Sequence, residues 1–310
     1  MTGDEQLHCA SCGQPIAPGD AFCESCGARV AESGHDRRAH SEIDLDGVAG
    51  VTDRGHVHDR NEDAFFVSAP HGRVVMVVCD GVSSSVDAHH AAQTAADVAG
   101  RALVGALEYH RGSADPTEEW DPRATISTAI TAAQSAVARI AVPERLNVEP
   151  SSCTLVAGLW DGETITVGWI GDSRAYWVEA GRAECLTVDD SWAQLQLDAG
   201  LMTARTAAAD PRAHMITGWL GKDAPSRAPR VWSLQPASRG HLILCSDGLW
   251  NYAADPDELA TMAPLDSADA SPLALAQAFT RAALLAGGHD NVTVAVLDTG
   301  SLPDPALEEQ

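Results

Sequence analysis

Short apolar segments bounded by turn residues dominate the chain after about residue 46, and they constrain the fold more than any other feature. The strand candidates are AFFVSA at 64–69, RVVMVVC at 73–79, CTLVAGLW at 153–160, ITVGWIG at 165–171, RAYWV at 174–178, HLILC at 241–245 and NVTVAVLD at 291–298. Hairpin signals such as Asp161-Gly162 join several of them. The chain must therefore bury an extensive sheet.

Helical stretches are few and do not alternate with the strands. Two Ala-rich segments, near Asp87–Tyr109 and Ala124–Ile140, follow one another in sequence, and a third runs near Pro272–Leu285. A doubly wound parallel sheet needs a helix between successive strands, so this order disfavours it. The sequence predicts an α+β fold with antiparallel sheets packed together and helices outside.

The charge balance narrows the range of partners. The 310 residues carry 20 basic and 44 acidic side chains, a formal net charge of −24, while 45% of the residues are hydrophobic. Such a chain can build a core, but it repels nucleic acid phosphates and anionic membranes. The longest apolar runs, such as Val74–Cys79, are too short to span a bilayer, and no secretory signal is evident. We expect a cytoplasmic protein with no nucleic acid or membrane partner.

The N-terminal segment carries two Cys-x-x-Cys motifs. Their thiols are Cys9, Cys12, Cys23 and Cys26. Four thiolates at this spacing can close a tetrahedral zinc site, and so short a segment needs a metal to fold; two separate redox dithiols are the alternative. The interpretation is a zinc ribbon over residues 1–28, able to dock a protein partner. A polar linker over 29–45 follows, in which His35 and His40 are read as solvated.

Acidic residues stand at the ends of five strand candidates. They are Glu62 and Asp63 before AFFVSA, Asp80 after RVVMVVC, Asp172 after ITVGWIG, Asp247 after HLILC, and Asp290 before NVTVAVLD. Any one of them could be an ordinary turn residue. Five such ends in one domain favour a shared site, because carboxylates at strand ends are costly to bury without a cation. Oxygen ligands of this kind suit Mg²⁺ or Mn²⁺, and two such ions can activate a water for attack on phosphorus.

These segments resemble a known family when they are read in order. RNEDAFFV, VVCDGVSSS, SSCTLVAGLW, VGWIGDSRAYWV, LTVDDSW, LILCSDGLW and GGHDNVTVAVL are similar to the successive motifs of metal-dependent protein phosphatases, the type 2C or PPM family of Ser/Thr phosphatases. The resemblance covers roughly Gly47 to Asp298. It implies a four-layer α-β-β-α sandwich with a dinuclear metal site at one edge of the central sheets.

The resemblance also implies a role for each acidic position. Asp80 resembles the aspartate that bridges the two ions. The Gly81 carbonyl and Glu62 resemble the further ligands of one ion, and Asp247 and Asp290 resemble the ligands of the other. Asp63 resembles a residue that orients these ligands, and Asp172 resembles one that assists a weaker third ion. In such enzymes a metal-activated water attacks and no side-chain nucleophile is used. Ser246 and Ser173 are accordingly expected to be structural, and Asn291 to form a turn.

Three positions depart from the family's usual pattern. Many relatives place a phosphate-binding arginine where this chain has His58, so the phosphate role falls to His58 or to Arg60. Val82–Ser85 replaces a segment that often carries a histidine. Asp190 stands where histidine is frequent, at the start of a variable flap.

The sequence thus predicts a zinc ribbon over 1–28, a flexible linker over 29–45, a phosphatase domain over 46–300 and a tail over 301–310. The expected activity is hydrolysis of phosphoserine and phosphothreonine in substrates of a Ser/Thr kinase. Two alternatives stay open: a phosphatase-like sensor or scaffold with weak turnover, and a phosphatase acting on another phosphate ester.

Overall fold

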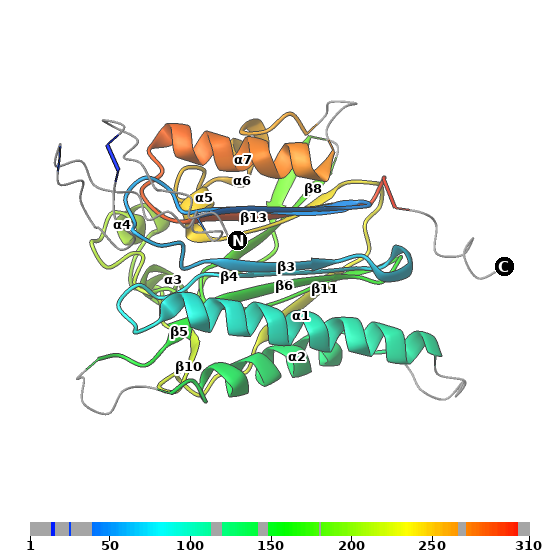
Figure 1. Ribbon diagram of the computed structural model, residues 1–310, viewed down its shortest axis with the longest axis horizontal. Helices are drawn as coiled ribbons and strands as arrows, with labels where there is room; N and C mark the ends of the chain where they lie inside the picture. Colours follow the sequence, from blue (N-terminus) through cyan, green and yellow to red (C-terminus); the bar gives the residue numbers. More distant parts are fainter. Residues whose placement is uncertain are drawn as a thin grey trace.

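Two antiparallel sheets pack face to face, and helices cover both outer faces (Figure 1). This computed structural model describes residues 14–15, 25, 39–112, 120–141, 148–179, 181–265 and 271–302. The four cysteines of the expected ribbon, His35, and most of the expected linker and tail lie outside these ranges.

The first sheet has six strands in the order β1-β2-β13-β12-β8-β9. Their bounds are β1 His40–Leu45, β2 Val48–Asp53, β13 Val292–Asp298, β12 His241–Cys245, β8 Arg174–Glu179 and β9 Arg182–Cys185. Neighbouring strands run antiparallel throughout. Strands from both ends of the domain therefore meet at its centre.

The second sheet has five strands in the order β11-β7-β6-β4-β3. Their bounds are β11 Arg230–Leu234, β7 Ile165–Ile170, β6 Leu155–Trp160, β4 Val74–Cys79 and β3 Ala64–Ser68. A short antiparallel pair, β5 Ser152–Cys153 with β10 Leu220–Gly221, lies beside it. A short 3₁₀ turn, Pro70–Gly72, joins β3 to β4.

The helices complete the sandwich. Helices α1 (Ala88–Gly112) and α2 (Pro122–Val137) pack on the five-stranded sheet, while α5 (Asp247–Trp250), α6 (Pro256–Thr261) and α7 (Pro272–Ala286) pack on the six-stranded one. A third apolar cluster, rich in valine, fills the space between the sheets. The expected α-β-β-α sandwich is confirmed.

The Ala-rich composition of α1 follows from how closely it approaches the sheet. Its buried face is mostly alanine, and a side chain at Gly100 would meet the Phe66 ring at 2.3 Å. Larger residues on this face would push the helix away from the sheet. The small residues therefore fix the height of α1 above β3 and β4.

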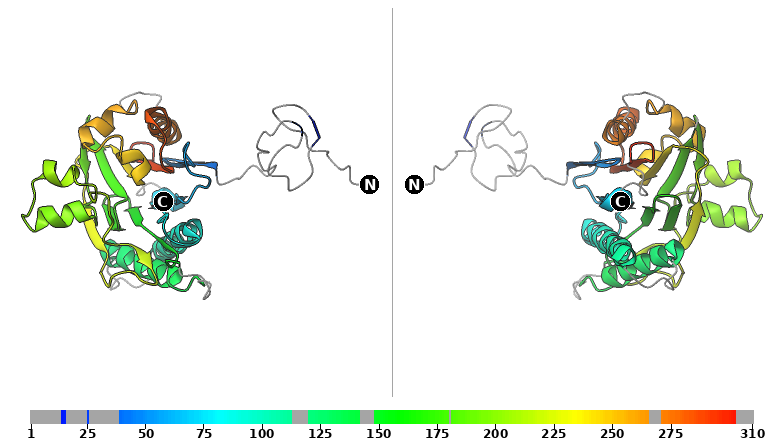
Figure 2. Two further views of the ribbon diagram at one scale, coloured as in Figure 1. Left: turned by 90° about the vertical axis from the view of Figure 1, so that its left-hand side faces the viewer. Right: turned by 90° about the vertical axis from the view of Figure 1, so that its right-hand side faces the viewer.

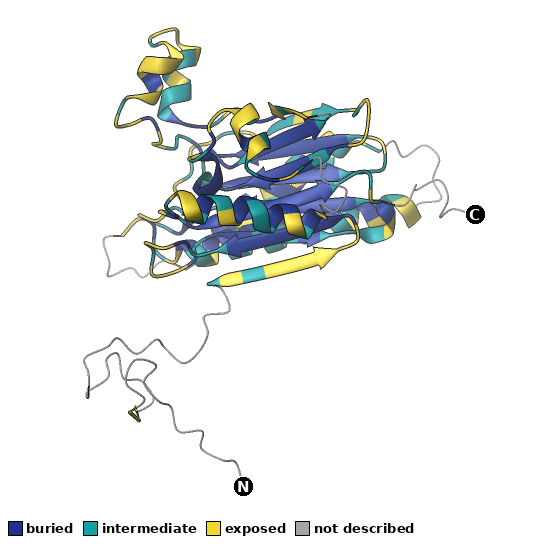
Figure 3. Cartoon of the chain, turned by 90° about the horizontal axis from the view of Figure 1, so that it is seen from above, coloured by how far each residue is buried: buried dark blue, intermediate teal, exposed yellow. Residues whose placement is uncertain are grey.

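Strand β1 corrects the expected domain boundary. His40–Leu45 was assigned to the flexible linker over 29–45, but it pairs along its whole length with β2 (Figure 3). Its sequence lacks the alternation of apolar and polar residues that marks a half-buried strand, because β1 is an edge strand with mostly exposed side chains. Even Ile43 is 40% exposed. Strand β1 therefore belongs to the sheet although it lies before residue 46.

A helical flap projects from the body between β9 and β10 (Figure 2). It contains α3 (Trp192–Asp198) and α4 (Ala204–Ala208), capped by Ser191 and by a Thr203 capping box. No helix among the described residues has the length and apolarity that crossing a membrane requires.

Candidate functional site

All five acid-bearing strand ends lie at one edge of the sandwich. Pairing sets Ala64 opposite Cys79 in the five-stranded sheet and Cys245 opposite Val294 in the six-stranded sheet. The start of β3 therefore adjoins the end of β4, and the end of β12 adjoins the start of β13. This register collects the candidate carboxylates although they are far apart in sequence.

A chain of buried hydroxyl and amide groups joins the two sheets beneath Asp63. The Ser246 hydroxyl donates to the Asp63 carboxylate (2.8 Å) and accepts from the Thr293 amide (3.0 Å). The Thr293 and Thr52 hydroxyls are 2.6 Å apart, and the Asn61 side chain donates to Thr52 (2.8 Å). Ser246 has the structural role that the sequence predicted, and the network fixes the orientation of Asp63.

A second network supports the loops that carry Asp80 and Asp172. The Asp80 amide donates to the Thr154 hydroxyl (3.2 Å), which lies 2.7 Å from the Ser173 hydroxyl. The Trp250 indole donates to the Asp172 carbonyl (2.9 Å). Ser173 is thus also structural, and Trp250 positions a candidate ligand as well as filling space.

Asn291 is a buried bridge, and its expected role as a turn-former was wrong. Its side-chain oxygen accepts from the Glu62 amide (2.7 Å), and its side-chain nitrogen donates to the carbonyls of Arg54 (2.7 Å) and Arg60 (3.0 Å). The side chain is 3% exposed. Asn291 therefore holds the loop before Glu62 against the start of β13, a long-range contact with no local sequence signature.

Two glycines allow the acid-bearing loops to approach each other. A Cβ on Gly81 would lie 2.7 Å from the Glu62 carbonyl oxygen, and one on Gly248 would lie 1.9 Å from the Asn291 carbonyl oxygen. Side chains at either position would force the backbones apart. The glycine after Asp80 and the one after Asp247 are thus required for close approach.

The buried carboxyls resist ionisation. Burial raises the pKa of Asp63 to about 8, with the charges of Asp290 and Asp247 adding to it and hydrogen bonds from Ser246 and Thr293 opposing it. Burial likewise raises the pKa of Asp247 to about 6, again with a contribution from Asp290. The pKa values of Asp80 and Asp172 are raised well above the ordinary value, first by burial and then by neighbouring carboxylates.

The donor chemistry fits divalent cations. Burial and mutual repulsion both oppose the ionised form of these aspartates, and a hard cation with oxygen ligands would relieve both. Across the ranges described, no three His, Cys, Asp or Glu side chains are grouped as a ready-made metal cage. The fit therefore rests on the identity and environment of the donors.

The two candidate phosphate-binding residues, His58 and Arg60, differ in their exposure and contacts. His58 lies with Nε2 3.3 Å from the Asp290 carboxylate and its side chain is 31% exposed. Arg60 is exposed, while its carbonyl is held by Asn291. Both therefore lie at the carboxylate edge.

The sequence did not predict two clusters of arginine and aspartate close to Asp172, in which three guanidinium groups pair with two carboxylates. Arg174 donates to both oxygens of Asp189 (2.9 and 2.7 Å) and lies 3.8 Å over the Trp250 ring. Asp190 is bound by Arg227 and Arg230. The adjacent acids in LTVDDSW were the only available signal, since their partners are remote in sequence.

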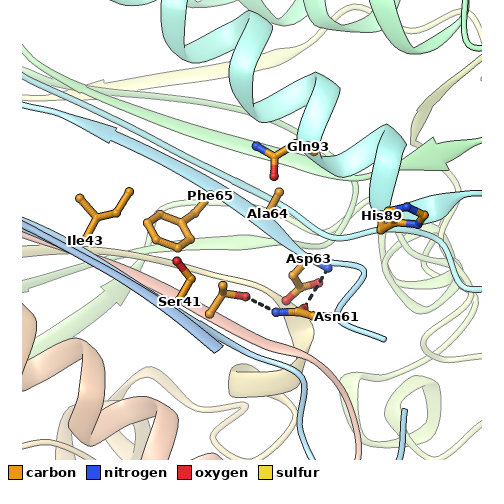
Figure 4. A pocket seen from close by; sticks show the side chains of 9 residues that line it. Ser41, Ile43, Asn61, Asp63, Ala64, Phe65, His89 and Gln93 are labelled. Carbon is orange, nitrogen blue, oxygen red and sulfur yellow. Dashed lines mark hydrogen bonds between the residues drawn. The ribbon is translucent and has the colours of Figure 1, made fainter. Parts of the chain in front are cut away.

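A cavity of about 240 Å³ lies between β1, β3 and α1, beside Asp63 (Figure 4). Its lining residues are Ser41, Ile43, Thr52, Asn61, Asp63, Ala64, Phe65, His89 and Gln93. The sequence did not predict it, because one wall is the strand that was assigned to the linker.

Comparison with known proteins identifies the family. The family model for protein phosphatase 2C matches residues 52–279, most of the chain. The chain belongs to the protein phosphatase 2C family. A zinc-ribbon domain model matches residues 8–30, in agreement with the expected N-terminal module.

Curated and solved relatives agree with this assignment. The serine/threonine protein phosphatase PstP of Mycobacterium tuberculosis is 30% identical over 251 residues, covering 81% of this chain and 44% of the relative. This chain therefore spans less than half the length of that relative. A crystal structure of the M. tuberculosis phosphatase PstP/Ppp is 27% identical, with a TM-score of 0.62 over 81% of this chain and 97% of that one. The PstP catalytic domain in complex with two manganese ions is 28% identical, with a TM-score of 0.60 over 81% and 96%.

The raised pKa values predict how stability depends on pH. Folded Asp63 keeps its proton up to about pH 8, whereas the unfolded chain releases it near pH 4. Stability of chelator-treated protein should therefore fall between pH 6 and 8, by up to about 1.4 kcal/mol per pH unit for this group. Asp63→Asn should reduce that slope, and Asp44→Asn on exposed β1 should not. Urea unfolding at pH 6 and pH 8 measures the free energy of unfolding of wild type and both variants. An equal change with pH in all three proteins would contradict the burial argument.

Proposed function

We propose that this chain is a metal-dependent phosphatase that hydrolyses phosphoserine and phosphothreonine in proteins. The observation that carries the proposal is the set of buried, mutually repelling carboxylates at one edge of a sandwich of the protein phosphatase 2C family. The name of the mycobacterial relative supports the Ser/Thr specificity, and the manganese-bound relative supports a dinuclear site.

The proposed ligands divide between two Mn²⁺ or Mg²⁺ ions. Asp80 would be shared by both ions. The Gly81 carbonyl and Glu62 would complete one site, and Asp247 and Asp290 would complete the other. Asp63 would orient these ligands, and Asp172 would assist a weaker third ion. When bound, such ions supply an activated water and withdraw charge from the phosphoryl oxygens.

The chain's own groups orient these ligands. The carboxylate of Asp63 is fixed by Ser246, and the backbone of Glu62 is fixed by Asn291. Ser246 and Ser173 are 0% and 1% exposed, so neither hydroxyl can reach a substrate phosphate as a nucleophile. This arrangement favours direct attack by water over a phosphoenzyme.

His58 and Arg60 are proposed to bind the substrate phosphate. His58 adjoins Asp290, so it would be held near the ions, and Arg60 offers an exposed guanidinium whose fork can grip two phosphate oxygens. Leaving-group protonation is assigned to water, since Val82–Ser85 carries no histidine.

The N-terminal module is proposed to bind one Zn²⁺ through Cys9, Cys12, Cys23 and Cys26. The zinc-ribbon match over residues 8–30 supports this assignment, and the module would serve as a docking site for protein partners. The substrates would be products of a Ser/Thr kinase. A cytoplasmic location suits the four free cysteines of the described domain, because thiols stay reduced there.

Turnover should depend on manganese and on Asp247. The protein should hydrolyse p-nitrophenyl phosphate and phosphothreonine peptides with Mn²⁺, and EDTA should abolish this activity. Asp247→Asn should lower kcat/KM by about 100-fold or more, because replacing a ligand costs at least as much as replacing its outer partners. Steady-state kinetics on both substrates measures it.

Two controls accompany this test. Asp257→Asn, exposed on α6, should keep full turnover. A chain lacking Met1–Arg29 should keep turnover on p-nitrophenyl phosphate within a few-fold, while its zinc content falls from one ion per chain to none. A folded, manganese-loaded wild type without turnover would support a scaffold role, and activity confined to small esters would favour another phosphate substrate.

The phosphate-binding assignment predicts a defect in substrate binding. His58→Ala combined with Arg60→Ala should lower kcat/KM for a phosphopeptide by about tenfold or more, since hydrogen bonds to a charged group are typically worth about 1.5–3 kcal/mol. Arg73→Ala, at the turn before β4, provides the comparison. Unchanged kinetics in the double variant would remove both residues from this role.

A further inference from the structure

Asp190 is the most completely enclosed charged side chain at the base of the flap. Its side chain is 0% exposed, accepts hydrogen bonds from the Gly171 amide (3.1 Å) and from Arg227, and forms an ion pair with Arg230 (2.9 Å). A Cβ on Gly218 would lie 2.8 Å from the same carboxylate, so the surrounding backbone fits closely around it. Three chain segments therefore converge on one carboxylate.

The backbone of Asp190 joins the two ends of the flap. Its amide donates to the Gly171 carbonyl (2.8 Å), and its carbonyl accepts from the Thr217 amide (2.7 Å). The next residue, Ser191, forms an isolated antiparallel bridge with Ile216. The flap thus leaves and re-enters the body at Asp190.

Gly171 connects this cluster to the candidate metal ligand Asp172. Gly171 has φ +106°, a conformation that glycine adopts readily, and its amide and carbonyl are both bound to Asp190. A second contact runs in parallel: flap residue His214 stacks on Trp250 (5.8 Å between ring centres), and Trp250 holds the Asp172 carbonyl. Displacement of the flap would therefore act on Asp172 through both contacts.

The charges make Asp190 depend on its partners. Its carboxylate is fully buried, whereas the side chains of Arg227 and Arg230 remain 30% and 34% exposed. Removing the negative charge leaves two neighbouring guanidinium groups that repel each other. Removing one arginine leaves the carboxylate paired with the other, which is the milder change.

We propose that Asp190, with Arg227 and Arg230, is a positioning unit that couples the flap to Asp172. It does not touch the substrate phosphate; it sets the affinity of the cation that Asp172 assists and the KM for protein substrates. This inference rests on the proposed phosphatase function for its kinetic part only, because its metal-binding part can be measured without turnover.

The test compares Asp190→Asn with Arg227→Gln and with their combination. Asp190→Asn should weaken the most weakly bound Mn²⁺ by about fivefold or more in calorimetric titration, the lower range of coupling between sites. KM for a phosphothreonine peptide should rise similarly, while kcat for p-nitrophenyl phosphate at saturating Mn²⁺ stays within about twofold. Arg227→Gln should change the Mn²⁺ affinity and the peptide KM in the same direction, but by less. The double variant Asp190→Asn with Arg227→Gln should recover part of the Mn²⁺ affinity that Asp190→Asn loses.

The matched control is Arg205→Gln, an exposed arginine on α4 of the flap. It should leave Mn²⁺ affinity unchanged. Hydrogen exchange should be faster at Gly171 and Thr217 in Asp190→Asn and not in the control.

A lower Tm with unchanged Mn²⁺ affinity and KM in Asp190→Asn would overturn the proposal, because the cluster would then be only structural. If that variant does not fold, Arg227→Gln decides by the same criteria. A wild type without turnover would refute the phosphatase function, whereas the Mn²⁺ and exchange measurements would still decide the coupling.

Discussion

Repulsion among buried carboxylates is the constraint around which this end of the sandwich is organised. Asp63, Asp80, Asp172 and Asp247 are all held where burial and neighbouring charge oppose ionisation. Such an arrangement survives only if other interactions fix it. Buried hydroxyls and one asparagine do so here, and they tie both sheets together beneath the acids.

The sheets supply the rigid frame that this arrangement needs. Antiparallel pairing brings strand ends from residues 63 to 290 to one edge, and a close-packed valine-rich layer between the sheets fixes their separation. Glycines at 81 and 248 then let the loops approach closely. The proposed cation site is therefore a consequence of register and close packing, and the flap is attached directly beside it through Asp190.

The sequence predicted strands β3, β4, β6, β7, β8, β12 and β13, the main helices and the shared edge of acids because each has a local signature, whereas β2, β9 and β11 were not among its strand candidates. Alternating or continuous apolar runs mark buried strands, and an acid directly beside such a run is conspicuous. Strand β1 lacked that signature because it is a solvated edge, so the start of the domain was misplaced. Asn291 and Asp190 were underestimated for another reason: the partners of their side chains lie 19 or more residues away, and side-chain contacts at that range leave no spacing to read.

The most direct test of the central claim is an anomalous diffraction map of the full chain crystallised with Mn²⁺. Two manganese peaks about 3.5–4 Å apart are expected. Asp80 should lie between them, Glu62 and the Gly81 carbonyl on one side, and Asp247 and Asp290 on the other. Peaks confined to other acids of this highly charged surface, with these carboxylates left uncoordinated at saturating Mn²⁺, would contradict the account.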